Sequence, residues 1–360
     1  MVILNKLQKV MPLALCAMLA GSVHAQAFAA NGKGAPKPLF LTMTNGSGSN
    51  YLVVVNTETK ETSYVPTNGF GGAGGNAGGV AALGTLAAAV NFNSQNVAIF
   101  VRHGNTMQPT QLIATASKPV SVVFAHSHLF VLGQTTLQSF AVYGDTVQTA
   151  ADGSTPLAHS DGSAAQVVGL NGAVAYTEKS GTIAIASVGA NGAPGLTGLQ
   201  QTVTLPAAPL NDTPFGMVGR GANLYVTIAH SDEEVLVVNA KIVSTAGGPL
   251  PYLKPGGGFL HAPCWNTLSG QYLYSADSPG QQVLRYLVSD TNVFYDTAVG
   301  PKFGGAPTDL YAAGNLLGVI DGGDGSTSNA SILTIDGEGE LTLKFSVKIA
   351  GAINGAAIVN

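Results

Sequence analysis

Seven polar residues recur along the chain, each at the end of a short apolar segment. They are Asn45, Asn91, Gln134, Glu178, His230, Asp277 and Asp321. Carboxylates and imidazoles are the side chains that most often act as general acids or bases. Glu178 is therefore the predicted base for opening or closing a lactone, with His230, Asp277 and His261 as predicted helpers. The competing interpretation is structural, because Asn, Asp and Glu also end strands by binding the backbone of turns.

A subset of these residues raises the question of a metal. Hard cations such as calcium bind several oxygen ligands at once. Asn45, Asn91, Glu178 and Asp321 would supply such oxygens from four places in the chain. Residues at strand ends around a wide tunnel sit back from its axis, so we expect no metal and no other cofactor. Calcium at these four residues is the alternative hypothesis.

Two further motifs carry reactive side chains and also have a structural interpretation. His126 and His128 have the i, i+2 spacing that places two imidazoles on one face of a strand, a spacing that suits a metal. They fall where a tight hairpin is expected, which favours a turn. Cys264 has only His261 as a nearby base in sequence, and a reactive thiol needs a base or a cation. We therefore expect Cys264 to be a small buried residue beside Trp265.

The segment Gly69–Gly79 (GFGGAGGNAGG) is the most glycine-rich part of the chain. Glycine loops cradle phosphates where they lead from a strand into a helix. No helical pattern follows this segment, so a nucleotide site is rejected and a flexible loop over the channel face is predicted. A Gly-x-Ser-x-Gly elbow is missing from the sequence, which argues against a standard serine hydrolase.

A sequence repeat positions the seven polar residues. Each follows an apolar strand and precedes a Gly/Ser/Asn turn and a second apolar strand. Subtracting their positions gives steps of 46, 43, 44, 52, 47 and 44 residues. A repeat of roughly 40–45 residues with about four strands is typical of a propeller blade. No long stretch has the 3.6-residue period of an amphipathic helix. The sequence therefore predicts an all-β, seven-bladed β-propeller.

The two ends of the repeat array are expected to meet. The first repeat lacks the strand that precedes the others, and Ala352–Asn360 (AINGAAIVN) supplies a strand at the far end. Pairing of this C-terminal strand with the N-terminal blade would close the propeller and remove exposed sheet edges. Residues 39–360 are accordingly predicted to form one domain.

The N-terminal residues read as a secretory signal. Lys6 and Lys9 precede the apolar stretch Val10–Ala20, and small residues allow cleavage after Ala25. Residues 1–25 are predicted to be removed as a signal peptide, which leaves residues 26–38 as a tail. The protein is expected in the periplasm or outside the cell. Cys264 is then the single remaining cysteine, so no internal disulfide is expected.

Composition restricts the partners. Charged residues make up 9% of the chain, and the net charge is −4. A phosphate-binding face needs clustered lysines and arginines, so no nucleic acid partner is expected. No later segment is long and apolar enough to span a membrane. We expect a monomer that meets a small-molecule substrate or, alternatively, a protein or glycan partner.

Several short motifs fall in order, about one per blade. They are Met43-Thr44-Asn45, Tyr176-Thr177-Glu178-Lys179, Thr213-Pro214-Phe215-Gly216, Ala262-Pro263-Cys264-Trp265, Ala306-Pro307-Thr308-Asp309-Leu310 and Gly322-Gly323-Asp324-Gly325. Together the chain from Leu39 to Asn360 resembles the bacterial lactonase-like propeller family, which is related to carboxymuconate cyclases and propeller-type 6-phosphogluconolactonases. The resemblance implies the propeller fold and chemistry on a lactone. It also supports Glu178 as the base.

The resemblance is weaker at the substrate site. Characterised members place His and Arg around a central pocket to hold an anion, and those positions find no one-to-one match here. Three arginines, Arg102, Arg220 and Arg285, remain in the whole chain. They suit a bidentate anion clamp poorly, so we expect a small, weakly charged substrate.

Two functions from different classes remain open. An exported lactonase-like enzyme should have a deep central pocket that converges on Glu178 and a histidine. A non-catalytic propeller that binds a protein, a glycan or a cell surface should instead have a shallow face or a plugged channel.

Overall fold

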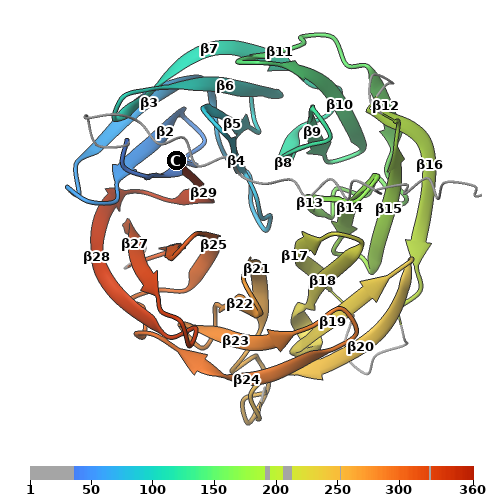
Figure 1. Cartoon of the computed structure of the whole chain (residues 1–360), viewed down its shortest axis with the longest axis vertical. Coiled ribbons are helices and arrows are strands. Elements are labelled where there is room, and N and C mark those ends of the chain that lie inside the picture. The colour runs from blue at the N-terminus through green and yellow to red at the C-terminus, as the bar shows by residue number, and fades with distance from the viewer. Residues whose placement is uncertain (1–35, 191–194, 206–212, 252, 324–325) are drawn as a thin grey trace, which may run out of the picture. The chain divides into compact units, whose positions relative to one another are not determined.

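The computed structural model describes residues 36–190, 195–205, 213–251, 253–323 and 326–360. The part from Pro36 to Asn360 is one compact unit. Its described residues form seven antiparallel sheets, which Figure 1 shows arranged around a common centre. The predicted signal peptide and nearly all of the predicted tail lie outside the described residues. Among the described residues, no helix has the length and hydropathy that crossing a membrane requires.

Each sheet has its strands in the same order from the centre outward. The innermost strands are β29 (Ile353–Val359), β4 (Val80–Leu83), β8 (Pro119–Ala125), β13 (Ala164–Leu170), β17 (Pro214–Arg220), β21 (Pro263–Ser269) and β25 (Pro307–Ala313). The second strands are β1 (Leu39–Thr44), β5 (Leu86–Asn91), β9 (His128–Gly133), β14 (Ala173–Glu178), β18 (Asn223–Ile228), β22 (Tyr272–Asp277) and β26 (Leu316–Asp321).

The outer half of each sheet repeats in the same way. The third strands are β2 (Ser49–Asn56), β6 (Asn96–His103), β10 (Thr136–Tyr143), β15 (Thr182–Val188), β19 (Glu233–Val238), β23 (Gln282–Val288) and β27 (Thr327–Ile335). The outermost strands are β3 (Thr62–Phe70), β7 (Thr106–Ala114), β16 (Leu196–Val203), β20 (Lys241–Gly247), β24 (Val293–Val299) and β28 (Leu341–Ala350).

The third blade differs at its outer edge. Two short strands, β11 (Thr146–Val147) and β12 (Gly153–Pro156), both pair with β10 in place of one long outer strand. A short 3₁₀ helix, η1 (Ala229–Ser231), follows β18. The rest of the described structure keeps the four-stranded pattern.

The innermost strands form a closed ring. Each contacts the next in the order β29, β4, β8, β13, β17, β21, β25, and β25 contacts β29 again. The fold is therefore a seven-bladed β-propeller, and the predicted fold class is confirmed.

The first blade is made by both ends of the chain. Leu39, Phe40 and Leu41 of β1 pair with Val359, Ile358 and Ala357 of β29. The guanidinium of Arg102 adds a clamp, because it donates hydrogen bonds to the carbonyl oxygens of Val359 and Lys37. The predicted closure by the C-terminal strand is confirmed.

The burial of the second strands explains why the repeat appears in the sequence as apolar runs. A second strand has a sheet neighbour on both sides and another blade against each face, so every residue of β5 is buried. Such a strand reads as a continuous apolar run instead of an alternating one. In the outermost strand β28 only Leu341, Phe345 and Ile349 are buried, and most of the other residues are exposed.

Proline begins four of the innermost strands, in β8, β17, β21 and β25. Proline has no N–H to donate, so within sheets it is confined to edges and first positions. An innermost strand is the edge of its blade, which satisfies that condition. The pairing register shifts within the first residues of these strands, for example between Pro307 and Asp309. This shift changes which side chains face the centre.

Candidate functional site

The seven polar residues lie at one end of the propeller. Each ends or directly follows a second strand, at the turn that leads to the third strand. Because successive strands are antiparallel, these turns share an end with the loops that join one blade to the next. We call this end the linker face, and the opposite end, with the turns between first and second strands, the hairpin face. Asp277 and Asp321 accept backbone N–H groups of their own turns, whereas Asn45 and Glu178 accept those of loops that are distant in sequence.

His261 and Asp277 are in direct contact. The Nδ1 atom of His261 lies 2.7 Å from Oδ2 of Asp277. Asp277 is fully buried and also accepts hydrogen bonds from the backbone N–H groups of Ala262 and Gly280. The register that pairs Pro263 with Asp277 brings this histidine to the end of β22. A buried carboxylate on Nδ1 fixes the orientation of the ring.

The other ring nitrogen of His261 is available. In the part of the chain that the structure describes, Nε2 of His261 has no hydrogen-bond partner, and the side chain is 19% exposed. An imidazole held through Nδ1 by a carboxylate presents Nε2 as a proton acceptor. The pair can therefore act as an oriented general base.

Cys264 lies close to this pair but lacks thiolate character. Burial, together with the charge of Asp277, raises the pKa of its thiol to about 12. The sulfur also donates a hydrogen bond to the carbonyl of Ala262. These contacts support the predicted structural role of Cys264 beside Trp265.

His230 lies in the neighbouring blade and has different partners. Its Nδ1 is 2.8 Å from the hydroxyl of Thr213, and its ring stacks on Phe259 with the ring centres 4.9 Å apart. Phe259 belongs to the loop that leads to His261. This stacking places the loop against His230. None of the described hydrogen bonds joins His230 to Asp277 or to Glu178.

Glu178 has the contacts of a loop anchor. Its side chain is fully buried at the end of β14. Its carboxylate accepts hydrogen bonds from the backbone N–H groups of His159 and Ser160, the latter at 2.9 Å. It lines neither of the two cavities described below. The role of Glu178 as a base stays a prediction.

The four residues of the calcium hypothesis each bind different protein groups. Asn45 accepts hydrogen bonds from the N–H groups of Gly72 and Ala73. Asp321 accepts from the N–H of Gly323 and the amide of Asn329. Asn91 bonds Asn50, Thr67 and Asn96, and Glu178 is described above. Within the described ranges, no group of three or more His, Cys, Asp and Glu residues is arranged to hold a metal.

His126 and His128 occupy a tight hairpin, as the repeat favours. His126 and Ser127 both have positive φ, 49° and 57°, as a two-residue turn between twisted strands requires. Nε2 of His126 lies 2.6 Å from the carbonyl oxygen of Leu170. His128 uses Nδ1 on the carbonyl of His126 and Nε2 on Asp152. The two imidazoles therefore bind separate groups.

The glycine-rich segment runs through the centre of the ring. The sequence predicted instead a flexible loop over the channel face. We call residues 71–79 the channel linker. Asn76 and Ala77 are almost fully buried. The N–H of Ala77 donates to the carbonyl of Ala165 in β13, and the indole N–H of Trp265 in β21 donates to the carbonyl of Asn76. The linker thereby contacts two blades that are not neighbours in the ring.

Two more contacts fix the linker at its glycines. The N–H of Gly78 donates to Oδ2 of Asp309 in β25 at 3.0 Å. Gly78 has a φ of 65°, which residues with a side chain rarely adopt. A Cβ atom on Gly79 would lie 2.2 Å from Oδ1 of Asn354 in β29. The linker therefore needs glycine to pass this close to the innermost strands.

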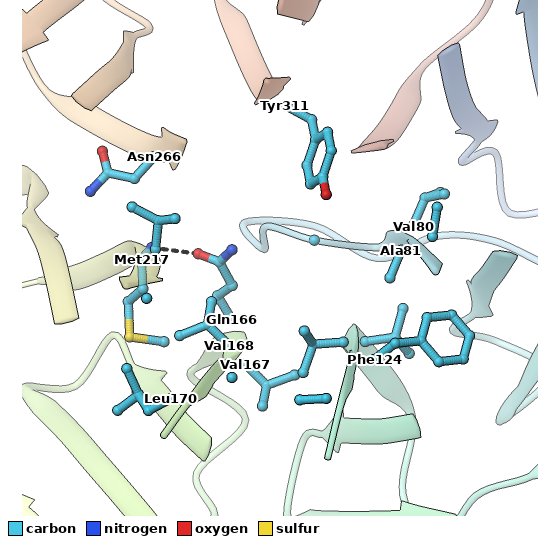
Figure 2. Close-up of a pocket in the computed structure, with 18 of the residues that line it drawn as sticks. Val80, Ala81, Phe124, Gln166, Val167, Val168, Leu170, Met217, Asn266 and Tyr311 are labelled. Carbon is cyan, nitrogen blue, oxygen red and sulfur yellow. Dashed lines mark hydrogen bonds between the residues drawn. The ribbon is translucent and has the colours of Figure 1, made fainter. Parts of the chain in front are cut away.

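A cavity of about 430 Å³ lies on the hairpin side of the linker. Residues from all seven innermost strands and Gly78 of the linker line it. Figure 2 shows apolar side chains such as Phe124, Val168 and Met217 around it, with the amide of Gln166 and the hydroxyl of Tyr311 directed inward. A smaller cavity of about 280 Å³ lies on the other side of the linker, against Asn76 and Trp265.

Apart from His126, the polar residues of the larger cavity were not selected from the sequence. Asp309 lines it and is almost fully buried, and burial raises its pKa to about 7. Asp309 belongs to the motif Ala306-Pro307-Thr308-Asp309-Leu310, and this motif was the sequence feature that could have identified it as a site residue. Gln166 and Tyr311 carried no motif, because their inward direction depends on strand register.

The three arginines are committed elsewhere. Arg102 clamps the closing strand, and Arg285 forms ion pairs with Asp296 and Glu340 at 2.7 Å each. Arg220 donates to the hydroxyl of Tyr225 and the carbonyl of Gly270. None of the three lines either described cavity.

Comparison with known proteins gives likeness in structure. A scan against protein-family models found no match. No curated protein matches in sequence. Among solved structures, a Bacteroides fragilis protein described as a candidate 6-phosphogluconolactonase is 15% identical, with a TM-score of 0.65 over 91% of this chain and 99% of its own. The periplasmic gluconolactonase PpgL of Pseudomonas aeruginosa is 14% identical, with a TM-score of 0.63 over 90% and 99%.

A third similar structure carries no assigned function. It is a protein from Desulfotomaculum acetoxidans, 12% identical, with a TM-score of 0.64 over 89% of this chain and 99% of its own. Identities this low establish architecture and leave the reaction open. The chain thus has the seven-bladed fold of the lactonase-like propellers.

Proposed function

We propose that the protein is an exported enzyme that opens or closes a lactone on a small, weakly charged organic molecule. The observation that carries this proposal is the contact between Nδ1 of His261 and the buried Asp277. Both residues were selected from the sequence as helpers. The fold is shared with a periplasmic gluconolactonase, which supports the reaction class and the compartment.

The geometry supports hydrolysis by general-base catalysis. His261 Nε2 takes a proton from a water molecule while the water oxygen attacks the lactone carbonyl. The ring C–O bond then breaks, and His261 returns the proton to the leaving oxygen. Asp277 stabilises the imidazolium that forms between the two steps. The product is a hydroxy acid, and closing the ring follows the same steps in reverse. In this proposal His230 lies beside the loop of His261, and Glu178 anchors the loop between the third and fourth blades.

The proposal predicts activity of the purified mature protein on neutral lactones, measured by acid release with and without a chelator. His261→Gln should lower kcat by about 100-fold or more, because general-base catalysis contributes that much. His103→Gln is the matched control, since His103 is exposed and lies on another strand. Wild-type activity in His261→Gln would remove this histidine from the mechanism.

One observation favours the second function, a non-catalytic propeller that binds a protein, glycan or cell-surface partner. The channel linker fills the centre of the ring with buried residues, Asn76 and Ala77 among them. A plugged centre suits a broad contact face better than a deep catalytic pocket. A protein that hydrolyses no lactone in the panel, yet binds glycan or cell surfaces through its linker face, would favour this function.

A further inference from the structure

The larger cavity has no part in the function proposed above. It lies on the hairpin side of the channel linker, while His261 and Asp277 lie on the linker face. Its volume of about 430 Å³ is within the range of small-molecule sites. Hairpin-turn residues His126, Asn171 and Gly221 line it, so it is reached from the hairpin face.

The walls of the cavity are mainly apolar. Val80, Phe124, Val168, Leu170 and Met217 are among the residues that line it, and Figure 2 shows their side chains around the space. Neither a lysine nor an arginine is found among its described lining residues. An anion would therefore enter without a counter-charge, which is costly in an apolar site.

Two hydrogen-bond donors point into the cavity from different blades. Oε1 of Gln166 accepts the N–H of Met217, which leaves the NH₂ of Gln166 as a donor. In Figure 2 this nitrogen and the hydroxyl of Tyr311 are directed to the interior. Neither has a partner among the described residues. Together they suit an acceptor oxygen held between β13 and β25.

The one carboxyl of the wall does not offer a cation site. Oδ2 of Asp309 accepts the N–H of Gly78, and Oδ1 accepts the N–H of Leu310. Both oxygens are thus occupied by backbone donors. A positively charged ligand would meet apolar surface on the other sides.

We propose that this cavity binds a neutral, mostly apolar small molecule that carries a carbonyl oxygen, such as a ketone, an ester or a lactone. The apolar walls bind the body of the molecule, and Gln166 and Tyr311 donate to its carbonyl. The site is separate from the His261–Asp277 pair and does not depend on its activity.

The test uses the mature protein and N-phenyl-1-naphthylamine, a neutral fluorophore that brightens in apolar sites. We expect saturable binding of one molecule per chain. The neutral ketone 2-undecanone should displace the fluorophore, and the anion decanoate should compete at least about 10-fold more weakly, since 1.4 kcal/mol corresponds to a factor of ten. Unsaturable binding, or equal competition by decanoate, overturns the proposal.

Three variants locate the site. Ala81→Phe adds bulk in the cavity wall and should weaken fluorophore binding about 10-fold or more. Tyr311→Phe should leave the fluorophore unaffected and weaken competition by 2-undecanone at least about 3-fold, because one donor is lost. Tyr64→Phe on the outermost strand β3 is the matched control and should change neither.

The experiment distinguishes failure of this proposal from misfolding of a variant and from failure of the proposed lactonase activity. Should Ala81→Phe fail to fold, unchanged ketone competition in Tyr311→Phe alone overturns the proposal. His261→Gln should bind the fluorophore with wild-type affinity whether or not it hydrolyses lactones. Loss of binding in that variant would contradict a separate site.

Discussion

Nδ1 of His261 lies 2.7 Å from Oδ2 of Asp277, and this carboxylate is fully closed off from solvent. Asp277→Asn keeps the shape but removes the charge that stabilises an imidazolium. We expect kcat on lactones to fall by about 100-fold or more with KM nearly unchanged, because the interaction strengthens as the histidine becomes charged. Steady-state kinetics across pH measures the split between kcat and KM.

The matched control is Asp321→Asn. Asp321 ends the second strand of the next blade, is buried and accepts backbone and amide hydrogen bonds, but contacts no histidine. The Asp321→Asn substitution should lower the free energy of unfolding without lowering kcat. Equal losses of kcat in both variants would mean that Asp277 acts only through the fold.

The loop contacts of Glu178 allow the predicted base to be tested directly. Glu178→Gln retains one acceptor for the N–H groups of His159 and Ser160 and loses the charge. A hydrogen bond to a charged group contributes about 1.5–3 kcal/mol, so we expect unfolding in urea to shift by roughly 1–2 kcal/mol. Lactone turnover should stay within a few-fold of wild type. A loss of turnover without a loss of stability would support Glu178 as the base.

Closure of the first blade predicts a local effect of Arg102. Arg102→Ala removes hydrogen bonds to the carbonyl oxygens of Val359 and Lys37. Amide hydrogen exchange should accelerate in β29 and at the start of β1, and the free energy of unfolding should drop by about 1–3 kcal/mol. Arg220→Ala removes one bond within the fifth blade and one bond to the sixth, so it should leave exchange in β29 unchanged.

The fold could be predicted because each blade repeats the same physical constraints. Leu86–Asn91 lies between two strands and two neighbouring blades, so its apolar run survives in the sequence as a clear signal. The closing strand could be predicted because one blade lacked a strand and Ala352–Asn360 had no other partner. Contact between His261 and Asp277 followed the same repeat, since Asp277 ends a strand that pairs with the strand after His261.

The centre of the molecule could not be predicted in the same way. The path of Gly78 and Gly79 depends on acceptors and small gaps offered by β25 and β29, which are distant in sequence. The inward direction of Tyr311 depends on a register shift near Pro307, and residue composition does not predict this shift. Local pattern specifies a blade, whereas the centre is specified by contacts among all the blades.

Asp309 predicts a pH dependence of stability. Burial raises the pKa of its carboxyl from an ordinary value near 4 to about 7. The folded state therefore holds a proton that the unfolded chain releases between about pH 4 and pH 7, so rising pH in that window lowers the free energy of unfolding. Asp309→Asn cannot ionise, so its stability relative to wild type should rise from pH 4 to pH 7 and level off above, by at most about 4 kcal/mol.

Urea unfolding at several pH values measures this difference. Asp232, whose pKa burial raises to about 8, is present in both proteins and cancels in the comparison. Asp290→Asn serves as the exposed control, since the side chain of Asp290 is 90% exposed, and its difference from wild type should not vary between pH 4 and pH 7. A constant difference for Asp309→Asn as well would mean that Asp309 is ionised throughout. The N–H of Gly78 would then hold a buried carboxylate, and the channel linker would be anchored by charge.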